Sequence, residues 1–533
     1  MDGGGHRITD TLVGRIVAIA GAQITIQLDA AAGSDDATAL QIGTLVKTQT
    51  PKSIVYGVVR GLTIAEPGST SPDAEIQMAD ISMIGETSVS DAGELLAFQR
   101  GMSRSPSLNR PVYATTSTDL ARVYAPPNVP SVNVGAIHQD TTLPAHVLTD
   151  ELLGNHFGIL GTTGSGKSCT VVLLLSAILD EHPNAHVVML DPHNEYTKAF
   201  GDRAEVLDTN TLELPYWLLN FDELMEVLFG AQADEGSAEA AILADLIPQA
   251  KREQIKDPTK GNHFTVETPV PYKFTDLIRR IDQEMGKLDK SDAVAPYRRL
   301  RARLVAMQTD IRFQFMFGGI SVTDRMSDVL SQLFRIPVDG KPISIVDLSG
   351  IPSEILNVVV SVICRLTFDF ALWCERSMPI LLVCEEAHRY APAIPERRYE
   401  MTKQALSRIA KEGRKYGASL CVISQRPSQL APELLSQCNT LFAMRMSNND
   451  DQEHLRGAMS DSSIGMLDFL PSLGNGEAIA VGQGVSLPVR IEFKNLPEEQ
   501  RPHSSTAVFT ESWKTGNQDM DFVHEIVRRW RRL

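Results

Sequence analysis

The stretch FGILGTTGSGKS, residues 157–168, decides the fold. A short apolar run leads into Gly161, and Gly166, Lys167 and Ser168 then open an apolar helical run. This order predicts a phosphate-binding loop, because glycines let successive N–H groups face one concavity while lysine and serine serve phosphates and Mg²⁺. We therefore expect a nucleoside triphosphate ligand. The residues predicted to contact it are Gly161, Thr162, Thr163, Gly164, Ser165, Gly166, Lys167, Ser168 and Cys169.

Composition indicates a globular protein with two or three domains. The chain has 533 residues, 43% of them hydrophobic and 22% charged. The first ten residues lack an apolar run, and the apolar stretch 357–373 is interrupted by Arg365 and Asp369. We therefore expect neither export nor membrane insertion, and a cytoplasmic location. The six cysteines form no C-x-x-C pair, which favours buried, reduced thiols over zinc or disulfides.

Residues 1–102 are predicted to form a small β-barrel. Alternating or β-branched runs between turns indicate strands at 13–19, 23–28, 44–50 and 53–59. Residues 1–150 carry 9 Lys and Arg against 15 Asp and Glu, a net −6 within a chain of net charge −16. Such a surface suits packing against neighbours better than nucleic acid, which would need a local basic channel. Residues 103–150 are predicted to be linker and edge strands.

Polar residues follow a second predicted strand that ends in Asp191. In a parallel α/β sheet, residues just beyond the carboxyl end of a strand face the ligand crevice. Asp191 and Glu195 are therefore candidates for contacts with the nucleotide site, through Mg²⁺ or water. The alternative for Asp191 is that it caps the turn that follows it.

Residues 221–335 have helical patterns without strand-like alternation, which predicts an inserted helical subdomain. Its YRRLRAR run, residues 297–303, is a candidate DNA contact. A solvated helix face or a subunit contact explains this run equally well.

Two acidic residues end a later apolar strand, residues 380–383. At this place a phosphoryl-transfer ATPase puts one carboxylate for Mg²⁺ and another that polarises the attacking water. We predict these roles for Glu385 and Glu386, with surface decoration as the alternative. A further buried strand ends near Gln425, a residue type that senses the γ-phosphate or orients water in this class.

The motifs together resemble a known family. The order GTTGSGKS, LDPHNEY, LLVCEEAHRY, LSRIAKEGRKYG, VISQRPSQL and NTLFAMRM is similar to that of the HerA group of hexameric DNA translocases, related to the FtsK pumps. The resemblance spans about residues 8–500 and is weak in the helical insertion. It implies an α/β fold with a RecA-like P-loop NTPase core at 151–500, an N-terminal barrel, and a C-terminal tail and helix at 501–533.

The resemblance also implies roles for single residues. Lys167 and Ser168 would hold the phosphates of ATP and Mg²⁺, Glu386 would activate water, and Gln425 would be the sensor. The first acid of the pair is often Asp in this family and is Glu385 here. Because the side chain of Glu385 is longer, two sets of Mg²⁺ ligands stay open. The first is Ser168 with Glu385, and in the second Asp191 shares the role of Glu385.

Basic residues around the predicted helix 399–417 are further candidates. Arg397 and Arg398 precede it, and in a ring whose strand ends face the axis their loop would reach DNA in the pore; a solvated basic turn is the alternative. In this class an arginine from outside the loop commonly neutralises transition-state charge. We expect it to come from the next subunit, and the candidates are Arg414, Arg408 and Arg445.

The function expected is that of an ATP hydrolase that forms a homo-hexameric ring and translocates double-stranded DNA. The resemblance implies a nuclease or another effector as partner, in DNA end processing or in bacterial defence against phage. The alternative is a ring ATPase that acts as a scaffold or switch for a partner enzyme. A protein-remodelling ATPase is less favoured, because the sequence has no clear aromatic pore signature.

Overall fold

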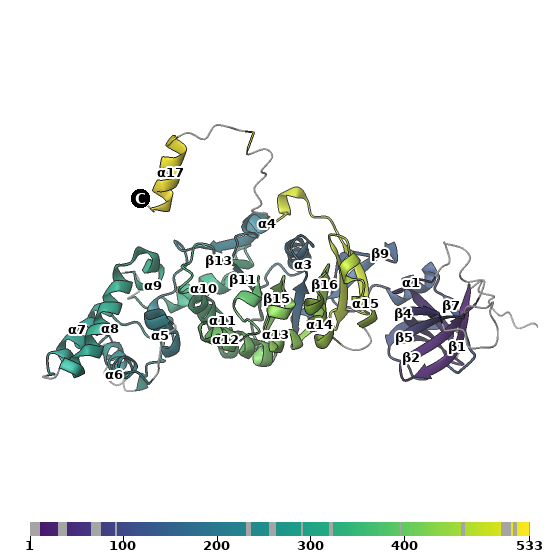
Figure 1. Ribbon diagram of the computed structural model, residues 1–533, viewed down its shortest axis with the longest axis horizontal. Coiled ribbons are helices and arrows are strands. Elements are labelled where there is room, and N and C mark those ends of the chain that lie inside the picture. The colour runs from purple at the N-terminus through teal and green to yellow at the C-terminus, as the bar shows by residue number, and fades with distance from the viewer. Residues whose placement is uncertain are drawn as a thin grey trace, which may run out of the picture.

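The computed structural model describes most of the chain. The described residues are 11–29, 40–64, 76–90, 93–230, 236–254, 263–288, 291–318, 323–394, 396–459, 464–502, 513–514 and 520–531. Figure 1 shows the β-barrel at one end, a large sheet with helices on both faces in the middle, and a group of helices at the other end. Much of the predicted C-terminal tail lies outside the described residues, which include α17 (Met520–Trp530).

The N-terminal body is a closed antiparallel barrel. Six strands pair in a ring, which closes because β2 pairs with both β1 and β5, and β6 adds to the outside of β5. Val13, Ile16, Ile24 and Ile26 belong to its buried core. The strands are β1 (Leu12–Ala20), β2 (Gln23–Leu28), β3 (Leu45–Gln49), β4 (Ser53–Ile64), β5 (Gln77–Val89), β6 (Leu95–Arg100) and β7 (Pro111–Ala114).

The barrel extends beyond the predicted boundary at residue 102. Strand β7 pairs with β1 and β3 and completes the ring, followed by α1 (Ser117–Val123) with its capping box of Thr116 and Asp119. A four-residue strand in a segment rich in Pro, Ser and Thr gives too few alternations to be predicted. The edge strands predicted in the rest of residues 103–150 correspond to β8 and β9, which lie at the edge of the large sheet.

The central sheet has eleven strands, and its order places the phosphate-binding loop in the middle. Strand β10 lies between β15 and β16, parallel to both, whereas β17, β18, β8 and β9 continue the sheet antiparallel. In order across the sheet the strands are β12 (Ala204–Leu207), β13 (Ile343–Asp347), β11 (Val187–Asp191), β14 (Ile380–Cys384), β15 (Ala418–Ser424), β10 (His156–Leu160), β16 (Cys438–Met444), β17 (Glu477–Gly482), β18 (Val489–Phe493), β8 (Ser131–Ile137) and β9 (Asp140–Leu148).

Helices cover both faces of this sheet, so its parallel strands are apolar throughout. On one face α3 packs on alternate residues such as Ile159 and Met189, and on the other α11 packs on residues such as Val188 and Leu382. The helices outside the insertion are α2 (Thr149–Leu153), α3 (Lys167–Glu181), α4 (Thr197–Phe200), α11 (Leu356–Trp373), α12 (Glu400–Glu412), α13 (Pro432–Ser436), α14 (Asn449–Ala458) and α15 (Ile464–Leu467).

Two details of these helices bear on the sequence analysis. Among the described residues, α11 alone has the length and hydropathy to cross a membrane, but 61% of it is buried inside the structure. The helix predicted at 399–417 is shorter, because α12 ends at Glu412 and a 3₁₀ turn follows at Gly413–Tyr416.

The six cysteine thiols are free, but Cys169 is exposed and Cys374 is half-buried, so they are not all buried as expected.

A helical subdomain lies between β12 and β13 in the chain. Its first helix is tied to the central body by a buried ion pair, in which Arg365 of α11 donates from Nη2 to the Glu223 carboxylate at 2.8 Å. Glu223 also forms a capping box with Asn220 at the start of that helix. The helices are α5 (Phe221–Phe229), α6 (Ala238–Glu253), α7 (Phe274–Met285), α8 (Ser291–Thr309), α9 (Gln314–Phe317) and α10 (Met326–Phe334).

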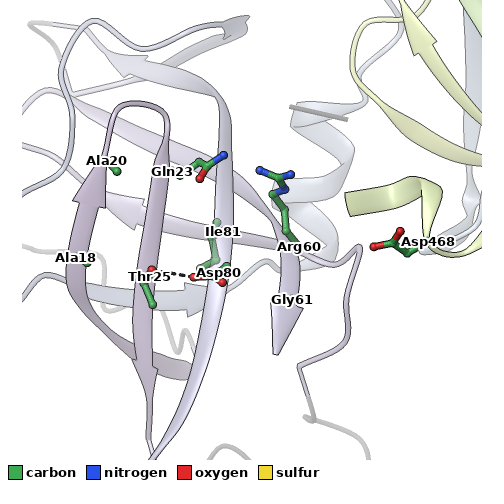
Figure 2. Close-up of a pocket in the computed structure, with 9 residues that line it drawn as sticks. All are labelled: Ala18, Ala20, Gln23, Thr25, Arg60, Gly61, Asp80, Ile81 and Asp468. Carbon is green, nitrogen blue, oxygen red and sulfur yellow. Dashed lines mark hydrogen bonds between the residues drawn. The ribbon is translucent and has the colours of Figure 1, made fainter. Parts of the chain in front are cut away.

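The barrel meets the central body through a few specific contacts. Arg100 at the end of β6 donates to the carbonyl oxygens of Gly482 (3.1 Å) and Val485 (2.8 Å), in the β17–β18 connection. Nearby, Leu487 joins an apolar cluster with Leu45, Tyr56 and Val58 of the barrel. Gln139 of the central body also donates to the carbonyl oxygen of Gly43 in the barrel. A cavity of about 400 Å³ lies between barrel strands and the α15 segment (Figure 2). Its lining includes Arg60, Asp80 and Asp468.

Candidate active site

The carboxyl ends of the seven parallel strands lie at one edge of the central sheet. The loop after β10 is fixed there to both neighbouring strands, since Gly161 N donates to Ser424 O at 3.2 Å and Thr162 N to Arg445 O at 2.9 Å. A third contact comes from the start of β17, where Gly476 N donates to Ser165 O at 3.0 Å. The predicted loop is therefore a rigid part of the sheet edge.

The backbone of this loop has the shape that a phosphate cradle requires. Gly164 and Gly166 have φ of 75° and 103°, in the left-handed region that favours glycine. A Cβ at Gly166 would lie 3.2 Å from the backbone nitrogen of Gly476, which leaves little room for a side chain. The N-terminus of α3 begins directly after it at Lys167, so its free N–H groups face the same place.

The lysine of the loop is held ready in a buried position. Lys167 is 6% exposed and donates from Nζ to Thr162 O at 3.2 Å. Burial lowers its pKa, and the charges of Glu385, Glu386 and Glu195 oppose this. Among the described residues, the buried Ser165 hydroxyl in the same loop has no hydrogen-bond partner. A cation surrounded by acids and an unsatisfied hydroxyl fit a nucleotide that carries phosphates and Mg²⁺.

Ser168 and the residues after β11 form the second part of the site. Ser168 Oγ donates to Glu195 Oε2 at 2.9 Å. Across the described residues there is no cluster of three or more His, Cys, Asp or Glu side chains that could hold a metal ion by itself. Mg²⁺ typically binds through one or two protein oxygens, substrate phosphates and water. Ser168, with Glu195 or Glu385, suits that arrangement.

Asp191 serves the local backbone. Its side chain is fully buried, accepts from His193 N at 3.2 Å and from Tyr196 N at 3.0 Å, and has a pKa raised by burial. The structure therefore supports the turn-capping interpretation over the predicted direct contact with the nucleotide site. By ordering this turn, Asp191 places Glu195 beside Ser168 and Tyr196 beside Glu385.

Glu385 is a buried acid at the end of β14. It is 3% exposed and accepts a hydrogen bond from the Tyr196 hydroxyl. Burial raises the pKa of Glu385 to about 8, with Glu386 as a further cause, while Lys167 opposes the shift. Without a bound cation this side chain is protonated at neutral pH, so a metal ion would have to displace its proton.

Glu386 occupies a strained backbone position. Its φ and ψ of 51° and 45° lie in the left-handed region, which is uncommon for glutamate and is typical of functional sites. The side chain is 3% exposed, and burial raises its pKa. Oε1 accepts a hydrogen bond from Gln425 Nε2. This conformation aims the carboxylate along the sheet edge towards the phosphate-binding loop.

Gln425 links this carboxylate to the phosphate-binding loop. Its Oε1 accepts from the hydroxyl of Thr163 at the loop tip, while its Nε2 donates to Glu386. A single side chain therefore contacts both the group that would meet the γ-phosphate and the group that would activate water. Its position is the one that a γ-phosphate sensor needs.

The sequence predicted no role for two residues of this edge, Tyr196 and His388, and predicted only a general contact with the nucleotide site for a third, Glu195. Tyr196 bonds to Glu385, Glu195 bonds to Ser168, and His388 lies beside Glu386. All three belong to segments that were singled out, LDPHNEY and LLVCEEAHRY. Their spacing after the strands places them at the sheet edge, but their partners depend on the conformation of the turns.

The candidate arginines lie in different surroundings. Arg408 stacks 4.0 Å from the centre of the Phe368 ring and approaches Asp369 at 3.5 Å, so it is engaged on α11. Arg414 is exposed in the 3₁₀ turn before β15, at the opposite edge from the phosphate-binding loop of its own chain. It lines a cavity of about 820 Å³ beside α2 and the end of α3. Arg445 touches the loop with its carbonyl oxygen.

Arg397 and Arg398 lie in a short 3₁₀ turn before α12, and both are exposed. Arg398 pairs with Glu396 at 3.0 Å and stacks 4.5 Å from the centre of the Tyr399 ring. Cys169, in the first turn of α3, is exposed next to Ser168, with a pKa raised by partial burial.

The raised pKa of Glu385 predicts how stability depends on pH. The pKa is about 8 in the fold against an ordinary 4.5, so between these values the folded chain binds more protons than the unfolded chain. The free energy of unfolding then falls as pH rises, by up to about 1.4 kcal/mol per pH unit. His156 and His388, whose pKa values burial lowers to about 4, have the opposite effect, but only below about pH 6.5.

Urea unfolding of the nucleotide-free protein between pH 6.5 and 8 measures this slope. We expect Glu385→Gln to lose stability less steeply than the wild type over that range. Equal slopes for the two proteins would contradict a buried, protonated Glu385.

Comparisons with known proteins agree with this geometry. The family described as Helicase HerA, central domain, matches residues 132–367. The DNA double-strand break repair helicase HerA of Pyrococcus furiosus is 24% identical, over 89% of this chain and 85% of that protein. The probable DNA double-strand break repair helicase HerA of Methanocaldococcus jannaschii is 26% identical, over 78% of this chain and 85% of that protein.

The fold has a solved counterpart. VirB4 of Thermoanaerobacter pseudethanolicus superposes with a TM-score of 0.50 at 17% identity, covering 70% of this chain and 99% of the VirB4 chain. The loop after β10 lies within the segment that the family matches, whereas the acids after β14 lie beyond the end of that segment. These similarities support a HerA-type ATPase of the P-loop class.

Proposed function

We propose that this chain forms a ring, a homo-hexamer, that uses ATP hydrolysis to translocate double-stranded DNA. The observation that carries the proposal is the Gln425 bridge, because it joins the loop that binds the nucleotide to the carboxylate that would act on water. DNA as the substrate is supported by the relatives, two of which are named as DNA double-strand break repair helicases.

ATP with Mg²⁺ would supply the γ-phosphoryl group that is transferred to water. Lys167 would hold the outer phosphates, and the Ser168 hydroxyl, which donates to Glu195, would be a ligand for Mg²⁺. Glu386 takes a proton from the attacking water, and its raised pKa makes it a stronger base than an ordinary carboxylate. Gln425 would release Thr163 and contact the γ-phosphate instead. The position of its side chain would then depend on whether ATP is bound.

A site shared between subunits follows from the position of Arg414. This arginine lies at the edge of the sheet opposite its own phosphate-binding loop, so it has no route to that nucleotide. In a ring packed head to tail it would face the nucleotide of the next copy. Its exposure, without an ion-pair partner among the described residues, is compatible with this role, whereas Arg408, which is also exposed, contacts Phe368 and Asp369 of α11.

We also propose a nuclease or another effector as partner, in DNA end processing or in defence against phage. Reduced thiols and the free state of all six cysteines are consistent with a cytoplasmic protein. Arg397 and Arg398 remain the proposed DNA contacts. Their turn follows β14 on the same sheet edge as the site, and both side chains are exposed.

The first prediction for this function is that duplex DNA stimulates ATP hydrolysis, measured at a stated salt concentration. Lys167→Ala should abolish turnover by removing the cation that holds the phosphates. Glu386→Gln should still bind ATP but lose about 10²- to 10⁴-fold in kcat, the usual contribution of a general base. Hydrolysis that is indifferent to DNA would favour the scaffold alternative, and wild-type turnover in Glu386→Gln would remove Glu386 as the base.

A second prediction concerns the DNA contacts. Arg397→Ala/Arg398→Ala should weaken duplex binding and reduce the slope of log K against log salt by about two for each engaged subunit. The DNA-free ATPase rate should not change. Arg298→Ala/Arg303→Ala, on the exposed side of α8, is the matched control. A slope changed only by the control pair would move the DNA site to the helical subdomain.

A third prediction tests the shared site. Arg414→Ala protein should bind ATP and assemble. Its ATP turnover should fall by at least about 10³-fold, the usual effect of losing an arginine finger. Excess Lys167→Ala protein should restore part of its activity, because that protein still carries Arg414 for its neighbours. Arg408→Ala, as a control, should lower thermal stability and keep most of its activity. Mixed rings that show no restored activity would place Arg414 outside the site.

A further inference from the structure

The two oxygens of the Glu386 carboxylate have unequal surroundings. Oε1 accepts from Gln425 Nε2. Oε2 is buried, and no described residue donates a hydrogen bond to it. A buried carboxylate oxygen without a donor is costly, so a group that can reach it matters for the conformation of the side chain. The imidazole Nδ1 of His388 lies 3.3 Å from this oxygen.

His388 is held by the strand that carries Gln425. Its Nδ1 lies 3.1 Å from the hydroxyl of Ser424, the last residue of β15. That hydroxyl also accepts from Arg426 N at 3.1 Å, and the carbonyl of Ser424 accepts from Gly161 of the phosphate-binding loop. The imidazole therefore lies where the ends of β14, β15 and β10 meet. A hydroxyl oxygen and a carboxylate oxygen both lie within reach of one nitrogen.

The charge state of His388 suits a fixed hydrogen-bond donor. Burial lowers its pKa to about 4, with Arg389 and Arg426 as further causes. The ring is therefore neutral at pH 7, and one of its two nitrogens carries a proton. A proton on Nδ1 faces Ser424 Oγ and Glu386 Oε2, both of which can accept it.

We propose that His388 is a positioning residue for ATP hydrolysis, in which Nδ1–H holds Oε2 of Glu386 and fixes the carboxylate that activates water. The contact is long and lacks hydrogen-bond alignment, and catalytic hydrogen bonds commonly tighten only when substrate binds. When Gln425 leaves Oε1 for the γ-phosphate, His388 remains and keeps the side chain of Glu386 from turning away. This inference rests on the proposed role of Glu386.

Two substitutions separate the roles of the ring nitrogens. The amide nitrogen of His388→Asn hangs from Cγ, as Nδ1 does, whereas that of His388→Gln extends to the place of Nε2. His388→Asn should retain a kcat within a few-fold of the wild type. His388→Gln should lose up to about 100-fold in kcat, the cost of a catalytic group misplaced by about 1 Å. KM for ATP should stay unchanged in both, because Lys167 and the loop are untouched.

The controls distinguish this inference from the role of Glu386 itself. His146→Gln, on edge strand β9, is a matched histidine change and should leave kcat unchanged, and thermal unfolding confirms that each variant folds. Wild-type kcat in His388→Gln, with Glu386→Gln inactive, would overturn the role of His388 alone. Equal losses in His388→Asn and His388→Gln would overturn the role of Nδ1. Full activity in Glu386→Gln would instead overturn the role of Glu386.

Discussion

The attachment of the phosphate-binding loop to the ends of its two neighbouring strands is the constraint on which the rest of the structure depends. Backbone hydrogen bonds from Gly161 to β15 and from Thr162 to β16 fix the loop, and Gly476 at the start of β17 adds a third bond. Gln425 directly follows β15, and the last residue of β15 accepts a hydrogen bond from Gly161. The same strand end therefore holds both the sensor and the phosphate-binding loop. The antiparallel half of the sheet, which begins at β17, is also where Arg100 docks the barrel. Through one continuous sheet the barrel is therefore connected to the nucleotide site.

The fold was largely predictable because its signals are local. Strands β10, β11 and β14 are short apolar runs followed by a glycine turn or by acids, and the loop needs only its own residues to be identified. Strand β7 was missed because its four residues pair with β1 and β3, which are distant in the sequence, and such pairing leaves no local pattern. The end of α12 at Glu412 was missed because a 3₁₀ turn keeps helical spacing for four more residues.

The site was predictable in its parts and less so in its connections. Lys167, Glu386 and Gln425 follow from their places after strands, which the parallel order of the sheet brings to one edge. Asp191 occupies an equivalent place but caps its own loop, because its carboxylate accepts hydrogen bonds from the N–H groups of His193 and Tyr196. Position after a strand predicts which residues reach the edge. Which of them face the ligand is decided by the turn conformation, which a single sequence specifies poorly.

The acidic surroundings of Lys167 explain why this edge suits a cycle of binding and release. Glu385, Glu386 and Glu195 surround a single buried cation, and burial raises the pKa of both Glu385 and Glu386. Without nucleotide the site holds protons and hydrogen bonds between its own side chains, such as Ser168 with Glu195 and Gln425 with Glu386. Mg²⁺ and phosphates would exchange these bonds for stronger ionic ones and expel a proton. Among the described residues, the side chains of this edge satisfy one another except at a few atoms, among them Oε2 of Glu386 and the hydroxyl of Ser165. The hydroxyl of Ser165 belongs to the loop that would hold the phosphates, and Oε2 of Glu386 faces Nδ1 of His388. The two unsatisfied groups therefore belong to the two parts of the site that would act on ATP and on water.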